Sequence, residues 1–186
     1  MSASLLSLNV GRPEPNGAKQ VGVTGIGKRP VESARLRPPG PKHGGLGSGL
    51  VGDFVGDQRH HGGDVQAVYA FAREELDWWS EQLGRPLPDG MFGENLTTVG
   101  LEVDGSRVGD RWAVGDEVVL EVTAPRIPCA TFAARMGEPH WVKRFTQVGR
   151  TGAYLSVVRG GTVNRGDAIE VVSRPDHDVT LPEVFR

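Results

Sequence analysis

Residues 101–128, LEVDGSRVGDRWAVGDEVVLEVTAPRIP, restrict the fold of this chain more than any other segment. Val118, Leu120 and Val122 recur at every second position, and side chains spaced in this way lie on one face of a β-strand. Paired Gly and Asp residues mark tight turns at positions 104–105, 109–110 and 115–116. The segment therefore predicts short strands that are joined by tight turns.

The rest of the chain extends this pattern with a few helices. Further strands are expected at residues 4–10, 152–158 and 166–173, and at the start of residues 18–31. Residues 67–85 begin as a strand and become a helix that ends at Gly84. Shorter helices are expected at residues 130–137 and 140–146, and residues 35–53 predict a long irregular loop. Many short strands and few helices favour a closed or sandwiched β architecture.

Length and charge exclude several classes of protein. A chain of 186 residues fits one domain. With 21 basic and 23 acidic residues it lacks the basic surface of a nucleic-acid-binding protein. It has no apolar run of 18 residues, so we expect no membrane span, and its first residues do not resemble a signal peptide. A single cysteine excludes an intrachain disulfide and fits a reducing compartment, so we expect a cytoplasmic protein.

Cys129, the only cysteine, lies between a predicted strand and a predicted helix. Pro125 and Pro128 stiffen this turn because each fixes its own φ angle. The start of a helix and the nearby Arg126 both favour a thiolate. The residue is thus a candidate nucleophile or soft-metal ligand, and the alternative is a small buried apolar side chain.

Known metal and catalytic motifs do not explain Cys129. The five histidines show no HExxH spacing, and one cysteine cannot supply a structural zinc site. A cysteine–histidine pair with His60, His61 or His140 stays open, although no family signature supports it.

Other candidate binding residues stand beside glycines. Lys28 and Arg29 lie in TGIGKRPV, which lacks the spacing of a phosphate-binding P-loop. His61 precedes Gly62-Gly63, and Asn95 follows Gly93 by two residues. Cations and imidazoles bind phosphate, and an amide both donates to and accepts from a heterocycle. The alternatives are solvated loops and polar turns. Taken together, these residues suit an anionic, phosphate-bearing cofactor whose metal binds a protein thiolate.

The ordered motifs resemble those of the MOSC family, named for the molybdenum cofactor sulfurase C-terminal domain. The sequence is similar to the stand-alone bacterial branch that includes the hydroxylaminopurine-resistance proteins. The motifs that carry this resemblance are residues 24–31, 52–71, 90–101, 108–132, 150–158 and 161–180. The resemblance implies one MOSC domain over residues 1–186, with its core at about residues 20–175 and a short tail at 176–186.

The resemblance also implies a mostly β fold with a few short helices around a closed barrel-like core. It implies that the domain binds the molybdenum cofactor, a molybdopterin-type group, and that Cys129 is the catalytic residue and the molybdenum ligand. The residues that fall on motif positions expected to face the cofactor are Lys28, Arg29, His61, Gly93, Asn95 and Arg126.

Relatives that bind this cofactor reduce N-hydroxylated compounds such as hydroxylaminopurines, hydroxylamines and amidoximes. By this resemblance the chain is a molybdenum-dependent oxidoreductase. Its electrons would come from partner proteins, namely a flavin reductase and an iron–sulfur or haem carrier, since the chain shows no flavin or iron–sulfur motif. Two alternatives stay open: a carrier of persulfide sulfur or of the cofactor, and a binding or sensing domain without turnover.

Overall fold

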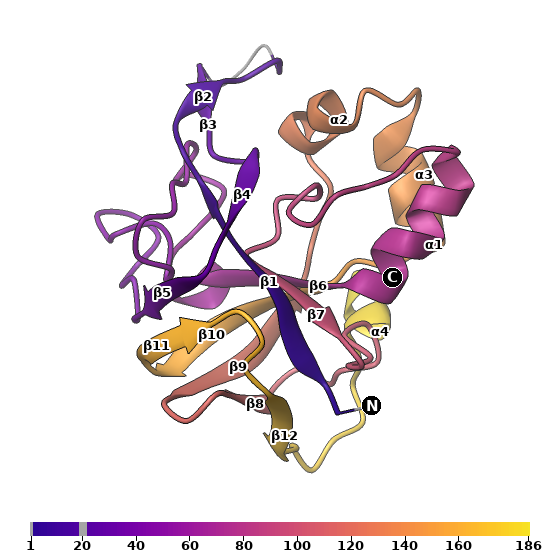
Figure 1. Ribbon diagram of the computed structural model, residues 1–186. Helices are drawn as coiled ribbons and strands as arrows, with labels where there is room; N and C mark the ends of the chain where they lie inside the picture. Colours follow the sequence, from indigo (N-terminus) through magenta and orange to yellow (C-terminus); the bar gives the residue numbers. More distant parts are fainter. Residues whose placement is uncertain (1, 19–21) are drawn as a thin grey trace.

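The computed structural model describes residues 2–18 and 22–186 and is built around one large β-sheet (Figure 1). The sheet has eight strands in the order β12-β8-β9-β10-β6-β7-β1-β4. Only β6 and β7 pair in parallel among these neighbours. The strands of this sheet are β1 (Ser4–Gly11), β4 (Lys28–Val31), β6 (Val68–Ala72), β7 (Leu96–Val99), β8 (Arg111–Val114), β9 (Val118–Pro125), β10 (Ala153–Arg159) and β12 (Ile169–Ser173).

Two small ribbons accompany the sheet. Strand β5 (Ser33–Leu36) pairs with β11 (Gly161–Asn164), and β2 (Glu14–Pro15) pairs with β3 (Val23–Thr24). Of the strand expected at the start of residues 18–31, residues 19–21 lie outside the described part of the chain. The expected loop at 35–53 begins as strand β5, and its remainder runs without a regular element towards the short 3-10 helix η1 (Asp64–Gln66).

The alternation read from the sequence matches burial in the sheet. Val118, Leu120 and Val122 of β9 are buried, as predicted. They belong to a core that also contains Leu5, Trp112 and other apolar side chains of the large sheet. The prediction of a mostly β chain with a few short helices is therefore confirmed.

Three helices gather on one side of the sheet, at the upper right in Figure 1. They are α1 (Arg73–Leu83), α2 (Ala130–Met136) and α3 (Trp141–Val148). Helix α1 follows β6 directly and ends at Gly84, whose φ of 64° is the left-handed value that glycine adopts readily. A second core, the aromatic cluster, fills the space beneath them with Trp79, Phe92, Phe132, Trp141 and Phe145.

Closure of the barrel stays a prediction. In the described residues no ladder joins β4 to β12, the two ends of the sheet order. Backbone hydrogen bonds nevertheless connect β1 to the entrance of β12, from the Leu5 amide to the Asp167 carbonyl at 2.9 Å and from the Ile169 amide to the Ala3 carbonyl at 2.9 Å. The two edges thus approach each other near the start of the chain.

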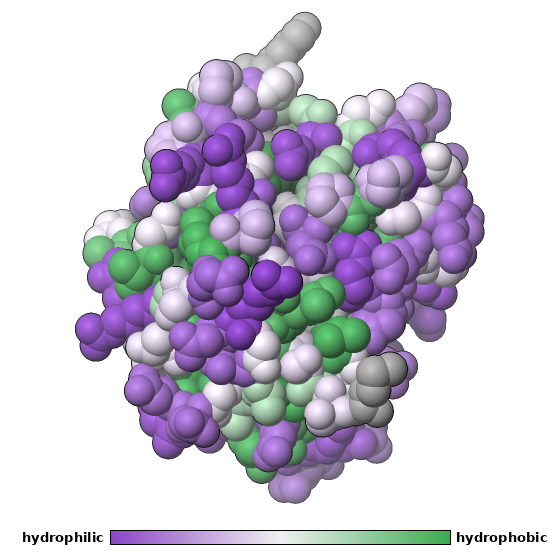
Figure 2. Space-filling model, viewed as in Figure 1, coloured by the Kyte–Doolittle hydropathy of each residue, from purple (hydrophilic) through white to green (hydrophobic). Residues whose placement is uncertain are grey.

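The segment 176–186 contains a fourth helix, α4 (Leu181–Phe185). Its Thr180 and Glu183 form a capping box, and Leu181 is buried in the core of the large sheet. No helix within residues 2–18 and 22–186 has the length and apolar character needed to cross a membrane. In the space-filling view, apolar side chains form small patches among polar ones on the face shown (Figure 2).

Candidate functional site

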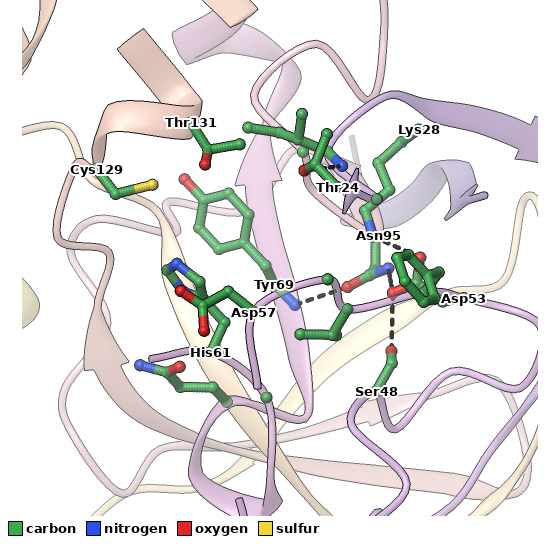
Figure 3. A pocket seen from close by; sticks show the side chains of 18 of the residues that line it. Thr24, Lys28, Ser48, Asp53, Asp57, His61, Tyr69, Asn95, Cys129 and Thr131 are labelled. Carbon is green, nitrogen blue, oxygen red and sulfur yellow. Dashed lines mark hydrogen bonds and ion pairs between the residues drawn. The ribbon is translucent and has the colours of Figure 1, made fainter. Parts of the chain in front are cut away.

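A pocket of about 710 Å³, including the part that opens to solvent, lies where the large sheet meets the aromatic cluster. Strands β3, β4, β6 and β10 contribute to its wall, together with loops that precede α2 and β7. Figure 3 shows Cys129, Asp57 and His61 on one side of it, and Lys28, Asp53 and Asn95 on the other. The pocket thus brings together residues that are far apart in the sequence.

Cys129 is the residue immediately before α2, and its backbone is extended, with φ −125° and ψ 172°. Pro125 and Pro128 are both buried, so the turn that carries the thiol is fixed by packing as well as by proline geometry. The half-buried thiol lines the pocket.

The thiol of Cys129 ionises more easily than an ordinary cysteine. Burial opposes ionisation and is the largest single influence on its pKa. Hydrogen bonding to His61, the charge of Arg126 and the backbone amide of Phe132 together outweigh burial and lower the pKa to about 7. A large fraction of the thiol is therefore thiolate, the form that binds metals, near neutral pH.

Arg126 is the most unusual group in the pocket. Its side chain is almost fully buried, with the residue 6% exposed, and Nη1 donates to the Phe92 carbonyl. The guanidinium lies 4.2 Å from the centre of the Phe132 ring and 4.8 Å from that of Tyr69. Within the described residues it has no carboxylate within ion-pair distance, and its Nε has no hydrogen-bond partner. Among the described residues, the Cys129 thiolate is the one nearby anion that favours the charge of Arg126, so a buried cation without a carboxylate partner is suited to bind an anionic ligand.

These residues fit the molybdenum cofactor on chemical grounds. Arg126 offers an unpaired cation with a free donor, and Cys129 offers a soft thiolate ligand. No group of three or more His, Cys, Asp or Glu side chains within the described ranges could hold a metal ion by itself. A metal on Cys129 therefore needs ligands from a bound organic group, as the molybdenum of a molybdopterin has.

Asp53 organises the opposite wall of the pocket. Its carboxylate pairs with the Lys28 ammonium and accepts hydrogen bonds from Ser48 Oγ at 2.8 Å, Asn95 Nδ2 at 3.0 Å and the Gly11 amide at 2.6 Å. The side chains of Lys28 and Asp53 are only 6% and 2% exposed. The charge of Lys28 is thus already balanced inside the protein, in contrast to that of Arg126.

The turn that contains Gly93 holds Arg126 through its backbone. The buried carboxylate of Glu94 accepts hydrogen bonds from the amides of Gly90 at 2.5 Å and Phe92 at 3.0 Å, and from Thr97 Oγ1 at 3.0 Å. Desolvation raises the pKa of Glu94 to about 7, although these hydrogen bonds lower it. Gly93 has φ 82°, and a Cβ there would stand 2.9 Å from Ile26 Cγ1, so the position requires glycine.

The structure brings most of the predicted site residues into one pocket. Its wall contains Lys28, His61, Gly93, Asn95, Arg126 and Cys129. Arg29 is the exception, because it is exposed and does not line the pocket. It follows Lys28 on β4, and successive side chains of a strand point to opposite faces.

Sequence reasoning missed Asp53 as a member of the site and left Tyr69 and Tyr154 without a role there. All three line the pocket. Asp53 lies in a loop of several glycines and aspartates, and no spacing in the sequence sets it apart from Asp57. Tyr154 was visible only as an aromatic residue close to Gly152.

Comparison with known proteins identifies this chain as a MOSC domain protein. The chain belongs to the MOSC domain family, which matches residues 57–170, a range that includes His61, Arg126, Cys129 and Tyr154. It is 36% identical to the Bacillus subtilis (strain 168) protein YflK over 181 residues, which cover 96% of this chain and 77% of YflK.

Two further comparisons bear on fold and activity. The crystal structure of YiiM from Geobacillus stearothermophilus superposes with a TM-score of 0.76 and 27% identity, covering 98% of this chain and 82% of that one. A protein of Gibberella moniliformis (strain M3125 / FGSC 7600) named "Reductase" is 35% identical over 133 residues, which span 69% of this chain but only 23% of the fungal protein. The MOSC family is associated with the molybdenum cofactor.

Proposed function

We propose that this protein binds the molybdenum cofactor and reduces N-hydroxylated compounds such as hydroxylaminopurines, hydroxylamines and amidoximes. The observation that carries the proposal is the buried guanidinium of Arg126, which has no carboxylate within ion-pair distance in the described residues and lines the same pocket as the Cys129 thiol. Membership of the MOSC family and the likeness to a fungal protein named "Reductase" support it.

The chain's own residues have separate tasks in this proposal. Arg126 binds the phosphate or the anionic edge of the cofactor, and Cys129 provides the thiolate that ligates molybdenum. Both amide hydrogens of Asn95 are used within the protein, so only its side-chain oxygen is left to accept a hydrogen bond from the pterin. His61 keeps the Cys129 thiol in its ionised form through hydrogen bonding. Lys28 neutralises the charge of Asp53 in the opposite wall of the pocket.

The reaction consumes two electrons and two protons for each substrate. The N–O bond of R–NHOH breaks, one proton joins the leaving oxygen, which departs as water, and the other joins the nitrogen, which becomes R–NH₂. When bound, the cofactor supplies the two-electron redox chemistry that amino-acid side chains lack. The electrons come from partner proteins, a flavin reductase with an iron–sulfur or haem carrier.

The experiment that tests this function uses protein expressed in a host with an intact molybdenum cofactor pathway. Reduced methyl viologen supplies electrons without oxygen, and chromatography follows the conversion of 6-hydroxylaminopurine to adenine. We expect one adenine for every two electrons consumed, and none with Cys129→Ser. Molybdenum-loaded protein that reduces neither 6-hydroxylaminopurine nor hydroxylamine nor benzamidoxime would refute the proposal. A persulfide on Cys129 of molybdenum-free protein would instead favour a sulfur carrier.

A further inference from the structure

Two tyrosines stand side by side in the pocket wall but differ at their hydroxyl groups. Tyr69 on β6 and Tyr154 on β10 are cross-strand partners, and their ring centres are 5.2 Å apart. The Tyr69 hydroxyl donates to the Thr151 carbonyl at 2.7 Å. Among the described residues, the one side-chain hydrogen bond at Tyr154 is donated by Thr123 Oγ1 to the Tyr154 main-chain carbonyl, at 2.9 Å. It does not involve the Tyr154 hydroxyl.

The Tyr154 hydroxyl is also not sealed from the pocket. In the described ranges, Arg126 Nε is one of the polar side-chain atoms that are fully buried and have no hydrogen-bond partner. The Tyr154 hydroxyl is not one of them. Tyr154 as a whole is half-buried and lines the pocket, whereas its neighbours Ala153 and Leu155 are fully buried in the sheet core. A ligand in the pocket can therefore reach a hydroxyl that the protein leaves unused.

Burial keeps this hydroxyl in its donor form. Burial raises the pKa of Tyr154, the charge of Arg126 opposes that rise, and a thiolate at Cys129 adds to it. The raised pKa means that the phenol stays protonated at neutral pH. Tyr154, Arg126 and Cys129 all line the same pocket.

Packing alone does not require an oxygen at this position. The Tyr154 ring packs against the aromatic cluster and Tyr69, and its partner on β9 is Ala124. A phenylalanine ring would make the same apolar contacts. The hydroxyl is therefore available for recognition.

We propose that Tyr154 donates a hydrogen bond to the oxygen of the substrate's N-hydroxyl group, and so distinguishes N-hydroxylated compounds from the amines that they become. This inference rests on the proposed function, whose substrate class it explains. Tyr154 keeps its proton throughout, and the oxygen leaves as water when the N–O bond breaks. Binding of the amine product leaves the hydroxyl without this partner, which favours product release.

The test compares the affinities of molybdenum-loaded protein for 6-hydroxylaminopurine and adenine, measured by isothermal titration calorimetry. We expect native protein to bind the N-hydroxylated purine more tightly. In Tyr154→Phe the ratio of the two affinities should fall roughly fivefold to tenfold, the effect of one neutral hydrogen bond, with a parallel fall in kcat/KM that comes mainly from KM.

Thr123→Val is the control, since it also removes one hydroxyl next to Tyr154 but Thr123 does not line the pocket. The Thr123 hydroxyl donates to the main-chain carbonyls of Val65 and Tyr154, so this change should lower the melting temperature and leave the affinity ratio unchanged. Melting temperature and molybdenum content verify that each variant is folded and loaded.

Four outcomes decide the matter. An unchanged affinity ratio in Tyr154→Phe would overturn the inference, and so would native protein that binds adenine as tightly as 6-hydroxylaminopurine. Failure of Tyr154→Phe to load molybdenum would also overturn the inference, because the hydroxyl would then serve the cofactor rather than the substrate. Selective binding that Tyr154→Phe abolishes, in protein that shows no turnover, would support the hydroxyl's role while it refutes the proposed reductase activity.

Discussion

Cys129 combines two influences that usually exclude each other, partial burial and easy ionisation. Its neighbours Pro125 and Pro128 fix the turn, and His61 and Arg126 favour the thiolate. The sequence predicted the stiff turn and the role of Arg126, because both lie within four residues of the cysteine. The contribution of His61 depends on a loop almost 70 positions earlier, and only the folded chain brings it to the thiol.

We predict that alkylation of Cys129 in cofactor-free protein follows a midpoint near pH 7. The thiolate reacts and the thiol does not, so the rate with iodoacetamide rises as pH increases through the pKa of about 7. His61→Gln should move the midpoint upward, because a group that lowers the pKa is lost. His60→Gln is the control, since His60 contacts Asp57 and is exposed. A midpoint at the ordinary thiol value in native protein would contradict this account.

Arg126 should be needed for ligand binding more than for folding. In Arg126→Met, relief of the desolvated charge offsets the lost hydrogen bond to the Phe92 carbonyl. We therefore expect the free energy of unfolding of cofactor-free protein, measured with urea, to change by less than about 1 kcal/mol. Bound molybdenum should fall severalfold in the same variant. A loss of several kcal/mol with unchanged molybdenum would show that Arg126 is a structural residue.

At the scale of elements, β4 separates two adjacent cations by the geometry of a strand. Lys28 is buried against Asp53, while Arg29 is exposed on the other face. Breaking a buried ion pair leaves an uncompensated charge, so Lys28→Met should cost about 3 kcal/mol of unfolding free energy. Arg29→Met should change it by less than about 0.5 kcal/mol. Equal effects of the two changes in urea titrations would be inconsistent with this arrangement.

The turn at residues 90–93 makes stability depend on pH through Glu94. Its folded pKa of about 7 lies above the ordinary 4.5, so folding favours the protonated carboxyl. This contribution is complete below pH 4.5 and is lost as pH rises through 7, by an amount on the order of 3 kcal/mol. Glu94→Gln should reduce the fall in unfolding free energy between pH 4.5 and 7.5, and Glu170→Gln, at an exposed position, should not. A Glu94→Gln profile parallel to the native one would refute this role.

Elements with a regular spacing of apolar residues were predictable from the sequence. Strands that depend on pairing with a distant segment were not. Helices α1, α2 and α3 and strands β1, β9 and β10 follow from local spacing and from turn residues such as Gly84. Strand β11 was not predicted, because its partner β5 lies more than 120 residues earlier. Such long-range pairing leaves no trace in the spacing of a single segment. For the same reason Asp53, which binds groups from four separate segments, was not predicted.

At the scale of the whole molecule, the pocket lies between two cores. The sheet core supports Asp53, Lys28 and Asn95, and the aromatic cluster supports Arg126 and the helix after Cys129. A bound group that contacts both walls should join them. Loading with cofactor should therefore raise the melting temperature of native protein, as binding to the native state alone requires.

The most direct test of the account is the molybdenum content of native protein and of Cys129→Ser, measured by elemental mass spectrometry after expression with an intact cofactor pathway. The account predicts nearly one molybdenum per native chain and a large decrease in Cys129→Ser, with both proteins folded. No molybdenum in either protein, under conditions that load a known molybdoenzyme, would contradict it.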